Sequence, residues 1–422
     1  MEKNIKQIVS SLRLFNTKFT LFDNILNDDC AKLPYDLIDF ASKFAVNGNV
    51  WHSYVAYFAI NNQNPFSLAC EYNKIAHDNS VFALGKLDCA TLFQLYNCDF
   101  GKELNFDAQL AITLQNFVCK QTLSYNQIVT DVISKLCKVL DKLQDESQAV
   151  EVFAEVYGKC GVGDLGMHKA FKIIKTEELQ EKTTSSIATI LPITRTDDRR
   201  LGDIIGCDLQ KNQIIDNTEA FLQGRQANNT LLYGDGGTGK SSSIKALLNE
   251  YYEQGLRIVE VYKHQFSYIS DIISQIKNRN YKFIIYLDDL SFEDFEIEYK
   301  YFKAIIDGGM ETKPSNVLIY ATSNRRHLIK ESFADKDDMA FDGELHKSDT
   351  LQEKLSLVSR FGLQIYFGAP NQAQYIEIVK QLALKYDVQM PDAELERKAL
   401  TWSIRNNGKS GRTAQQFINS LL

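Results

Sequence analysis

The chain carries near its middle the stretch Gly234-Asp235-Gly236-Gly237-Thr238-Gly239-Lys240-Ser241, which matches the phosphate-binding loop pattern G-x-x-x-x-G-K-[ST] at every position. Residues 229–233 before it form an apolar run that suits a buried strand, and residues 241–252 after it place apolar side chains at helical spacing. A loop between a strand and a helix can direct backbone N–H groups at a phosphate chain, at the positive end of the helix dipole. The stretch therefore predicts a site for ATP or GTP.

The loop pattern assigns chemistry to individual side chains. Lys240 is expected to reach the β- and γ-phosphates, and the hydroxyl of Ser241 is expected to ligate Mg²⁺. The loop and the first helical turn should surround the phosphates with the groups of Gly234, Gly236, Gly237, Thr238, Gly239 and Ser242. ATP and Mg²⁺ are thus the cofactors that the sequence predicts.

Two further apolar runs end in polar side chains. Residues 281–287 are followed by the carboxylates Asp288 and Asp289, and residues 316–323 are followed by the amide of Asn324. Because ligands of parallel α/β sheets bind at the carboxyl ends of the strands, these side chains should lie beside the phosphate loop. Asp288 takes the place of a Walker B acid, which holds Mg²⁺ through its water shell. The alternative reading of Asp288 is a helix cap.

Apolar runs that suit buried strands alternate with helical patterns beyond residue 201. They predict an α/β fold with a five-stranded parallel sheet and flanking helices. The five runs cover residues 229–233, 257–262, 281–289, 316–324 and 363–367.

The N-terminal part of the chain has helical periodicity instead. Apolar side chains recur every four residues at Ile128, Val132, Leu136 and Leu140. Residues 1–180 are therefore expected to form an all-helical domain. Its aromatic cluster is expected to pack in the core, with a docking face as the alternative, and comprises Trp51, Tyr54, Tyr57 and Phe58. Residues 181–200 are rich in Ser, Thr and charged side chains, which indicates a linker to the second domain.

One glycine-rich stretch resembles a second nucleotide motif. Residues 161–166 spell G-x-G-x-x-G, the dinucleotide fingerprint, which has mechanical meaning only after a strand and at the start of a helix. Here the pattern follows a helical segment. We therefore expect a turn between two helices, with a glycine ending the first.

Composition limits the remaining classes of function. The formal net charge of −7 is shared by both halves of the chain, so neither half has the basic character of a nucleic-acid-binding domain. The N-terminus reads as an amphipathic helix, and the longest nearly apolar run, residues 50–60, is too short to cross a bilayer. A cytoplasmic protein is expected. The eight cysteines include no C-x-x-C pair, and no histidines stand at metal-ligand spacing.

Taken together, the motifs resemble the AAA+ ATPase superfamily over residues 201–422. The matching elements are a box-like Leu201–Gly206, the phosphate loop, the Asp288-Asp289 pair, a sensor-1-like Asn324, Ser359-Arg360-Phe361-Gly362, and Gly411-Arg412. Residues 287–292 and 320–326 look most similar to an uncharacterised bacterial family of predicted ATPases. The Asp-Asp pair and the Ser-Arg-Phe box are similar to those of replication initiators and helicase loaders.

The resemblance implies roles for single residues. It places the nucleotide base at Ile205 and Gly206, and it implies that Asn324 positions the attacking water. Asp289 stands where many AAA+ motors have Glu, and its shorter side chain is expected to make hydrolysis slow.

Two arginines are assigned by the same resemblance. It implies that Arg360 is an arginine finger that reaches the γ-phosphate of a neighbouring subunit, with Arg325 and Arg326 as rivals for that role. Arg412 would be a sensor-2 contact from a helical lid that spans residues 370–422, after an ATPase core at 201–369. Each arginine could alternatively form a surface ion pair.

Two classes of function remain open. The first is an ATP-hydrolysing homo-oligomer, by resemblance a hexamer, that remodels or loads a protein or nucleoprotein partner. The second is a nucleotide-gated adaptor with slow turnover, whose helical domain recruits the partner through a hinge in the linker. A small-molecule kinase would not need the sensors, the arginine box and the lid in this order.

Overall fold

The protein is described here from a computed structural model that covers residues 4–18, 20–72, 79–120, 126–175, 188–291, 301–303, 305–306, 314–324, 358–406 and 408–422. The chain divides into two compact units, Met1–His168 and Lys169–Leu422, which are called unit 1 and unit 2. Within the described ranges, no helix combines the length and the apolar character needed to cross a membrane.

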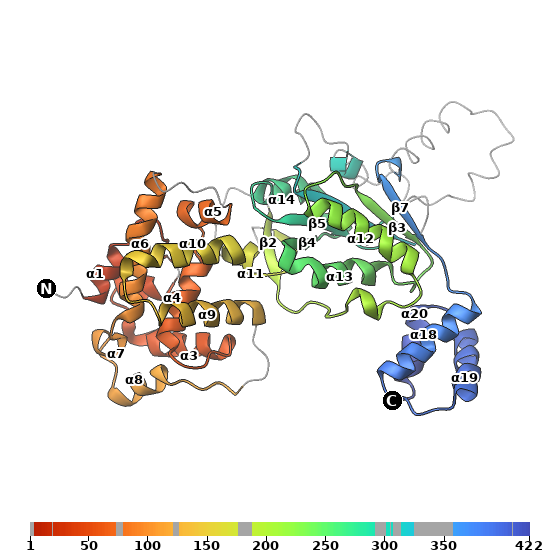
Figure 1. Ribbon diagram of the computed structural model, residues 1–422, viewed down its shortest axis with the longest axis horizontal. Coiled ribbons are helices and arrows are strands. Elements are labelled where there is room, and N and C mark those ends of the chain that lie inside the picture. The colour runs from red at the N-terminus through yellow and green to blue at the C-terminus, as the bar shows by residue number, and fades with distance from the viewer. Residues whose placement is uncertain are drawn as a thin grey trace. The chain divides into compact units, whose positions relative to one another are not determined.

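The described residues of unit 1 form helices and their connecting loops, with an isolated β-bridge between Gly48 and Phe117 (Figure 1). Its α-helices are α1 (Ile5–Ser10), α2 (Leu21–Leu26), α3 (Leu33–Lys43), α4 (Val50–Asn61), α5 (Pro65–Glu71), α6 (Ser80–Asn97), α7 (Phe100–Glu103), α8 (Ala108–Gln115), α9 (Gln127–Leu140), α10 (Ala149–Cys160) and α11 (Gly163–Met167). The stripe predicted at residues 128–140 lies on α9, where Val132, Leu136 and Leu140 are buried.

Helix α4 lies at the centre of unit 1 because it is apolar on nearly every side. Trp51 is fully buried, and its indole N–H donates to the carbonyl oxygen of Leu95 at 2.6 Å. Phe22 meets the rings of Trp51 and Phe58 edge to face, with ring centroids 5.8 and 4.7 Å apart. The expectation that the aromatic cluster packs in the core is confirmed for Trp51, Tyr54 and Phe58, and Tyr57 packs against that core while partly buried.

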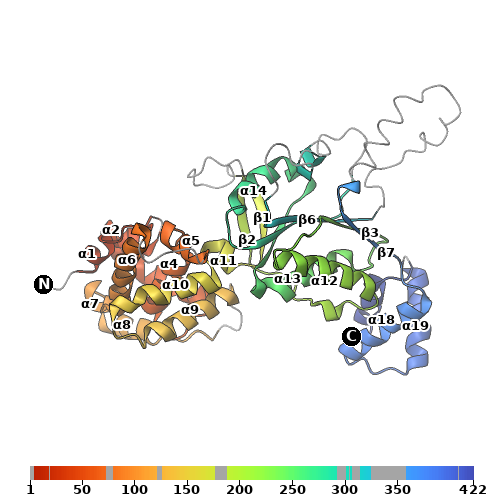
Figure 2. The same cartoon turned by 45° about the horizontal axis from the view of Figure 1, so that its top comes forward.

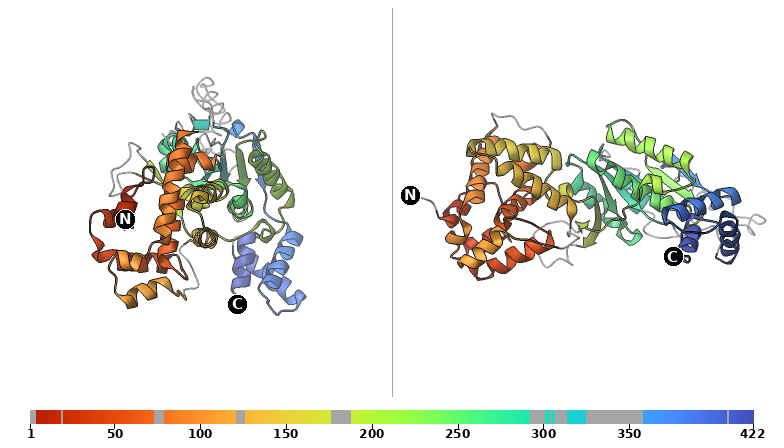
Figure 3. Two further views of the ribbon diagram at one scale, coloured as in Figure 1. Left: turned by 60° about the vertical axis from the view of Figure 1, so that its left-hand side comes forward. Right: turned by 60° about the horizontal axis from the view of Figure 1, so that its bottom comes forward.

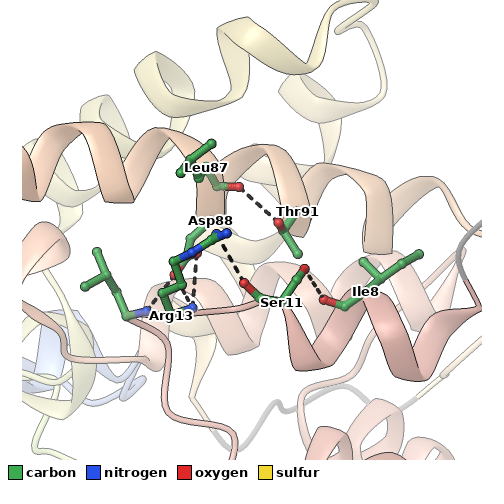
Figure 4. A network of polar contacts seen from close by, with 7 residues as sticks. Ile8, Ser11, Arg13, Leu87, Asp88 and Thr91 are labelled. Atoms are coloured by element: carbon green, nitrogen blue, oxygen red, sulfur yellow. Dashed lines mark hydrogen bonds and ion pairs between the residues drawn. The ribbon is translucent and has the colours of Figure 1, made fainter.

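A buried carboxylate joins the N-terminal segment of unit 1 to α6 (Figure 4). Asp88 has no exposed surface, and it accepts hydrogen bonds from the backbone N–H groups of Arg13 (2.9 Å) and Leu14 (2.7 Å). The guanidinium of Arg13 lies 3.7 Å from the same carboxylate. A buried charge is tolerated only when it is paired and hydrogen-bonded, and both conditions hold here.

The dinucleotide-like stretch at residues 161–166 is a turn between helices, as expected. Helix α10 ends at Gly161, which has φ 79°, and α11 begins at Gly163. The backbone N–H of Val162 donates to the buried carboxylate of Glu71 at 3.1 Å. This backbone N–H is therefore paired with an internal carboxylate.

Unit 2 is built on a sheet of seven strands in the order β2-β1-β4-β5-β6-β3-β7. All neighbours pair in parallel except β1 and β2, which are antiparallel. The strands are β1 (Ala170–Lys175), β2 (Ala188–Ile193), β3 (Thr230–Gly234), β4 (Leu256–Glu260), β5 (Lys282–Leu287), β6 (Val317–Ser323) and β7 (Leu363–Phe367).

The sequence-based prediction of five strands is wrong by two. The additional strands, β1 and β2, fall in the stretches predicted as the end of the helical domain and as the linker. Both stand beside a polar stretch, and their strand character depends on pairing: β1 joins the edge of the sheet along β4, and β2 then pairs with β1. Lys169 already accepts a sheet hydrogen bond from the N–H of Ile258 at 3.1 Å, directly after the last residue of unit 1.

Helices cover both faces of this sheet, as Figure 2 shows. Helices α12 (Asp208–Leu222) and α13 (Lys240–Tyr251) pack on one face, where their apolar side chains share a core with Ile258, Ile284 and Leu318. Helix α14 (Ile269–Ile276) lies on the opposite face. Because helices cover both faces of these strands, the sequences of β5 and β6 are nearly continuous apolar runs.

The last three helices form a group with its own core, which appears in blue in Figure 3. They are α18 (Gln372–Lys385), α19 (Asp392–Arg405) and α20 (Gly411–Asn419). Tyr375, Val379 and Phe417 are buried among them. Sequence cues for these helices are clear, because Asn371 caps α18 with a capping box and the side chain of Ser410 caps α20.

Candidate nucleotide-binding site

The phosphate-loop stretch joins strand β3 to helix α13, as predicted. Gly234 pairs with Phe367 of β7, and a Cβ atom on Gly234 would lie 2.1 Å from the carbonyl oxygen of Phe367, so only glycine fits. Gly237 and Gly239 have φ values of 75° and 100°, in the left-handed region that favours glycine. A Cβ on Gly236 would meet nothing within 4 Å, which leaves that part of the loop open to a ligand.

Polar contacts hold the loop in shape. The hydroxyl of Thr238 donates to the carbonyl oxygen of Asp235 at 2.8 Å. The carboxylate of Asp235 in turn accepts the backbone N–H of Ala369 at 2.7 Å, so the segment that follows β7 fastens the loop. These bonds preorganise the N–H groups that a phosphate chain requires.

Lys240 is buried beneath the loop. Its ammonium group donates to the carbonyl oxygens of Gly234 (2.8 Å) and Asp235 (2.6 Å) and to Oδ1 of Asn324 (3.0 Å). Burial lowers the pKa of Lys240, and the carboxylates of Asp235, Asp289 and Asp288 partly oppose that shift. The structure therefore brings the predicted lysine and the predicted sensor amide into direct contact.

Asp288 follows β5 and meets the first turn of α13. Its Oδ1 accepts hydrogen bonds from the hydroxyl groups of Ser241 (2.7 Å) and Thr322 (2.6 Å). Partial burial alone would raise the pKa of Asp288, but the hydroxyl groups of Thr322, Tyr286 and Ser241 outweigh it and lower the pKa below the ordinary value. The two residues predicted to hold Mg²⁺ are thus adjacent.

Asp289 takes a left-handed backbone conformation with φ 52°. Its N–H donates to the hydroxyl of Thr322 at 3.0 Å, and its carboxylate accepts the side-chain amide of Asn324 at 2.8 Å. The Thr322 hydroxyl therefore binds the carboxylate of Asp288 and the backbone of Asp289, although the sequence reasoning did not single it out. The available signal was a hydroxyl two residues before Asn324, at the end of a mostly apolar strand.

The predicted base-binding segment lies beside the loop. Ile205 packs against the core of the C-terminal helices, and Gly206 has φ 83°. The methyl group of Ile204 would lie 3.3 Å from a Cβ on Gly239. Asp203 pairs with Lys385 of α18 at 2.5 Å, so the segment connects the loop to the C-terminal helices.

The two predicted arginines lie in different places. The backbone N–H of Arg412, at the start of α20, donates to the carbonyl oxygen of Gly237 at 3.3 Å, so Arg412 borders the phosphate loop. Arg360 precedes Leu363, and Leu363 pairs with the first residue of β3. Arg360 is therefore at the end of the sheet opposite the loop. Arg325 and Arg326 lie outside the described residues.

Ser242 has a partner that the sequence reasoning missed. Nη1 of Arg199 donates to the Ser242 hydroxyl at 3.0 Å. Nothing in the residue spacing marks Arg199, because it lies 43 positions earlier, within the stretch predicted as a linker. Among the described residues, no three His, Cys, Asp or Glu side chains gather as a metal site.

Comparisons with known proteins place the chain in a family. The family described as "Protein of unknown function (DUF815)" matches residues 176–422. The large subunit of replication factor C from Staphylothermus marinus is 37% identical over 75 residues, which are 18% of this chain and 17% of that protein.

Two solved structures are also similar. The Holliday junction branch migration motor RuvB of Thermotoga maritima is 18% identical, with a TM-score of 0.35, and the match covers 52% of this chain and 63% of that chain. A DNA replication initiation factor is 18% identical, with a TM-score of 0.36, and covers 53% and 64% respectively. This chain spans less than two thirds of any of these three proteins. With its family match over more than half its length, the chain belongs to the DUF815 family.

Proposed function

We propose that this protein binds ATP with Mg²⁺ at the phosphate loop and hydrolyses it. One observation carries the proposal: side chains from two strand ends and one helix start converge on the loop. Lys240 contacts Asn324, Asn324 contacts Asp289, and Ser241 contacts Asp288. These are the lysine, the sensor amide and the two carboxylates that phosphoryl transfer in P-loop proteins employs.

The residues have separate tasks in this proposal. The three N–H donors of Lys240 now bind two carbonyl oxygens and Asn324, and they would be redirected to the β- and γ-phosphate oxygens. Ser241 and Asp288 would hold Mg²⁺, which neutralises charge on the phosphates when bound. The carboxylate of Asp289 would accept a proton from the attacking water, and Asn324 would orient that water.

We propose that the active form is a homo-oligomer, with a hexamer favoured by resemblance. The placement of Arg360 supports this, because a guanidinium at the opposite end of β7 is far from its own phosphate loop and suited to a neighbour's. Arg412, which borders the loop in its own chain, would act in cis from the C-terminal helices as a lid. The work of the oligomer would be to remodel or load a protein or nucleoprotein partner.

A specific contact favours the nucleotide-gated adaptor as second candidate. The carboxylate of Asp289 is engaged by the amide of Asn324, and aspartate is one methylene shorter than the glutamate of many AAA+ motors. Both features would slow proton abstraction from water. In that case ATP binding itself would change the state of the protein, provided that its two states bind nucleotide differently.

Steady-state turnover with a matched variant separates the two. Asp289→Asn keeps the size of the side chain and tolerates the left-handed backbone, but removes the base. If the wild type hydrolyses ATP at about 1 s⁻¹ or faster and Asp289→Asn retains ATP affinity while losing turnover, the hydrolysing function is supported. Binding of ATP with turnover that is equally low in both proteins would favour the adaptor. Failure of the wild type to bind ATP would contradict both.

A further inference from the structure

Arg199 lies on a segment that runs along helix α13 and includes a 3-10 helix at Leu201–Asp203. The segment is named the strap here and comprises residues 197–204. The side-chain amide of Asn249, near the C-terminal end of α13, donates to the carbonyl oxygens of Asp197 (2.6 Å) and Arg199 (2.8 Å). At its other end the strap brings Ile204 against the phosphate loop. The strap is therefore fixed at both ends of the helix that follows the loop.

The guanidinium of Arg199 has a defined orientation although its side chain is 55% exposed. Asp197 accepts Nε at 3.1 Å and Nη2 at 2.7 Å, which is a forked pair of charge-assisted bonds. The same carboxylate accepts the backbone N–H of Arg199 at 3.0 Å. The remaining arm of the fork, Nη1, donates to the hydroxyl of Ser242 at 3.0 Å.

Ser242 is the third residue of α13, whose N-cap is Gly239. The first backbone N–H groups of a helix have no partner within the helix, so those of Lys240, Ser241 and Ser242 are available to an anion. A hydroxyl that accepts one hydrogen bond can still donate its own proton. The Ser242 hydroxyl is thus placed between a guanidinium and the phosphate site.

We propose that Arg199 is a positioning residue for the phosphate chain of a nucleoside di- or triphosphate. Asp197 holds the guanidinium, the guanidinium polarises the Ser242 hydroxyl, and this hydroxyl donates to a phosphate oxygen. The strap leads on to Ile205 and Gly206, the segment expected at the base, so the phosphate served is the one nearest the nucleoside. The inference rests on the proposed function, because it needs a nucleotide in the loop.

Calorimetric titration of the full-length protein with Mg·ATP and Mg·ADP tests this role. Arg199→Gln should lower the affinity for both nucleotides by a similar factor of about five. The two factors should be similar because both nucleotides contain the phosphate nearest the nucleoside. The factor should be modest because the lost hydrogen bond is charge-assisted but exposed. The matched control is Arg195→Gln, which replaces an exposed arginine just before the strap in the sequence. It should change neither the ATP nor the ADP affinity. Asp197→Asn, which loosens the guanidinium without removing it, should give a smaller loss in the same direction.

A double-mutant cycle tests the route through Ser242. In a Ser242→Ala background, Arg199→Gln should lower the nucleotide affinity by less than about twofold, because the hydroxyl that transmits the effect of Arg199 is absent. An Arg199→Gln affinity equal to that of Arg195→Gln would overturn the proposal, and so would a full fivefold loss in the Ser242→Ala background. A loss confined to ATP would contradict the assignment to the shared phosphate. A wild type that binds neither nucleotide would instead refute the proposed function, which separates the two failures.

Discussion

The substitution Thr322→Val tests whether one hydroxyl organises the two carboxylates beside the loop. Thr322 is 2% exposed, donates to Asp288 at 2.6 Å and accepts the N–H of Asp289 at 3.0 Å. Valine has nearly the same shape but no hydrogen-bonding group, so the change removes both bonds with little change in packing volume. Asp289 would also lose an anchor of its left-handed conformation.

The size of the effect follows from the environment of each bond. A hydrogen bond to a charged group contributes about 1.5–3 kcal/mol, and an unpaired buried backbone N–H costs about 1–3 kcal/mol. Asp288 and Asp289 both reach solvent, so water replaces part of what is lost. We expect a destabilisation of unit 2 by about 2 kcal/mol, which for a domain of this size lowers its melting temperature by about 4–8 °C.

Activity should fall further than stability, because the misplaced groups are those that handle Mg²⁺ and water. Turnover of ATP is expected to drop at least about tenfold, while ATP affinity, which depends mainly on Lys240 and the loop, changes less than about threefold. The assays are thermal unfolding, calorimetric ATP binding and steady-state hydrolysis. Thr401→Val, at an exposed helical position, is the control and should leave all three unchanged. Wild-type stability and turnover in Thr322→Val would refute the reasoning.

Three further predictions concern other parts of the chain. Arg360→Ala should keep ATP affinity and lose turnover, and mixing it with Lys240→Ala should restore part of the hydrolysis; no recovery, together with a monomer by light scattering, would count against a shared site. Asp88→Ala should destabilise unit 1 by about 3 kcal/mol in urea unfolding, because two partly buried N–H groups lose their buried acceptor; the exposed Asp131→Ala serves as control, and equal midpoints would contradict this. The fragment 169–422 should fold with a higher melting temperature than 201–422, because the shorter fragment lacks β1 and β2 and exposes the edge of β4; an equal melting temperature would show that these strands add nothing.

Much of unit 2 could be predicted because its central strands are buried on both faces. Residues 281–287 and 316–323 are almost wholly apolar, and their ends carry the polar groups of the site. Strands β1 and β2 lack this signal. The outermost strand β2 is only partly buried along most of its length, and β1 is partly exposed, so neither their pairing nor their count follows from local periodicity.

Some residues of the candidate site could also be predicted from the sequence, and others could not. Lys240, Ser241, Asp288, Asp289 and Asn324 belong to fixed spacings or to strand ends, and the structure brings them together. Thr322 and Arg199 act through contacts between segments distant in the chain, 34 residues for Thr322 to Asp288 and 43 for Arg199 to Ser242. No pattern of single residues encodes such contacts, because they arise from how the strands and the strap pack.

The most direct test of a nucleotide site at the phosphate loop is calorimetric titration of Mg·ATP into the full-length wild type and into Lys240→Ala. We predict saturable binding by the wild type and at least about a hundredfold loss in the variant, because Lys240 supplies the charge that meets the β- and γ-phosphates. Thermal unfolding without nucleotide serves as the check that the variant is folded. Equal affinity of the two proteins, or no binding by a folded wild type, would contradict the account.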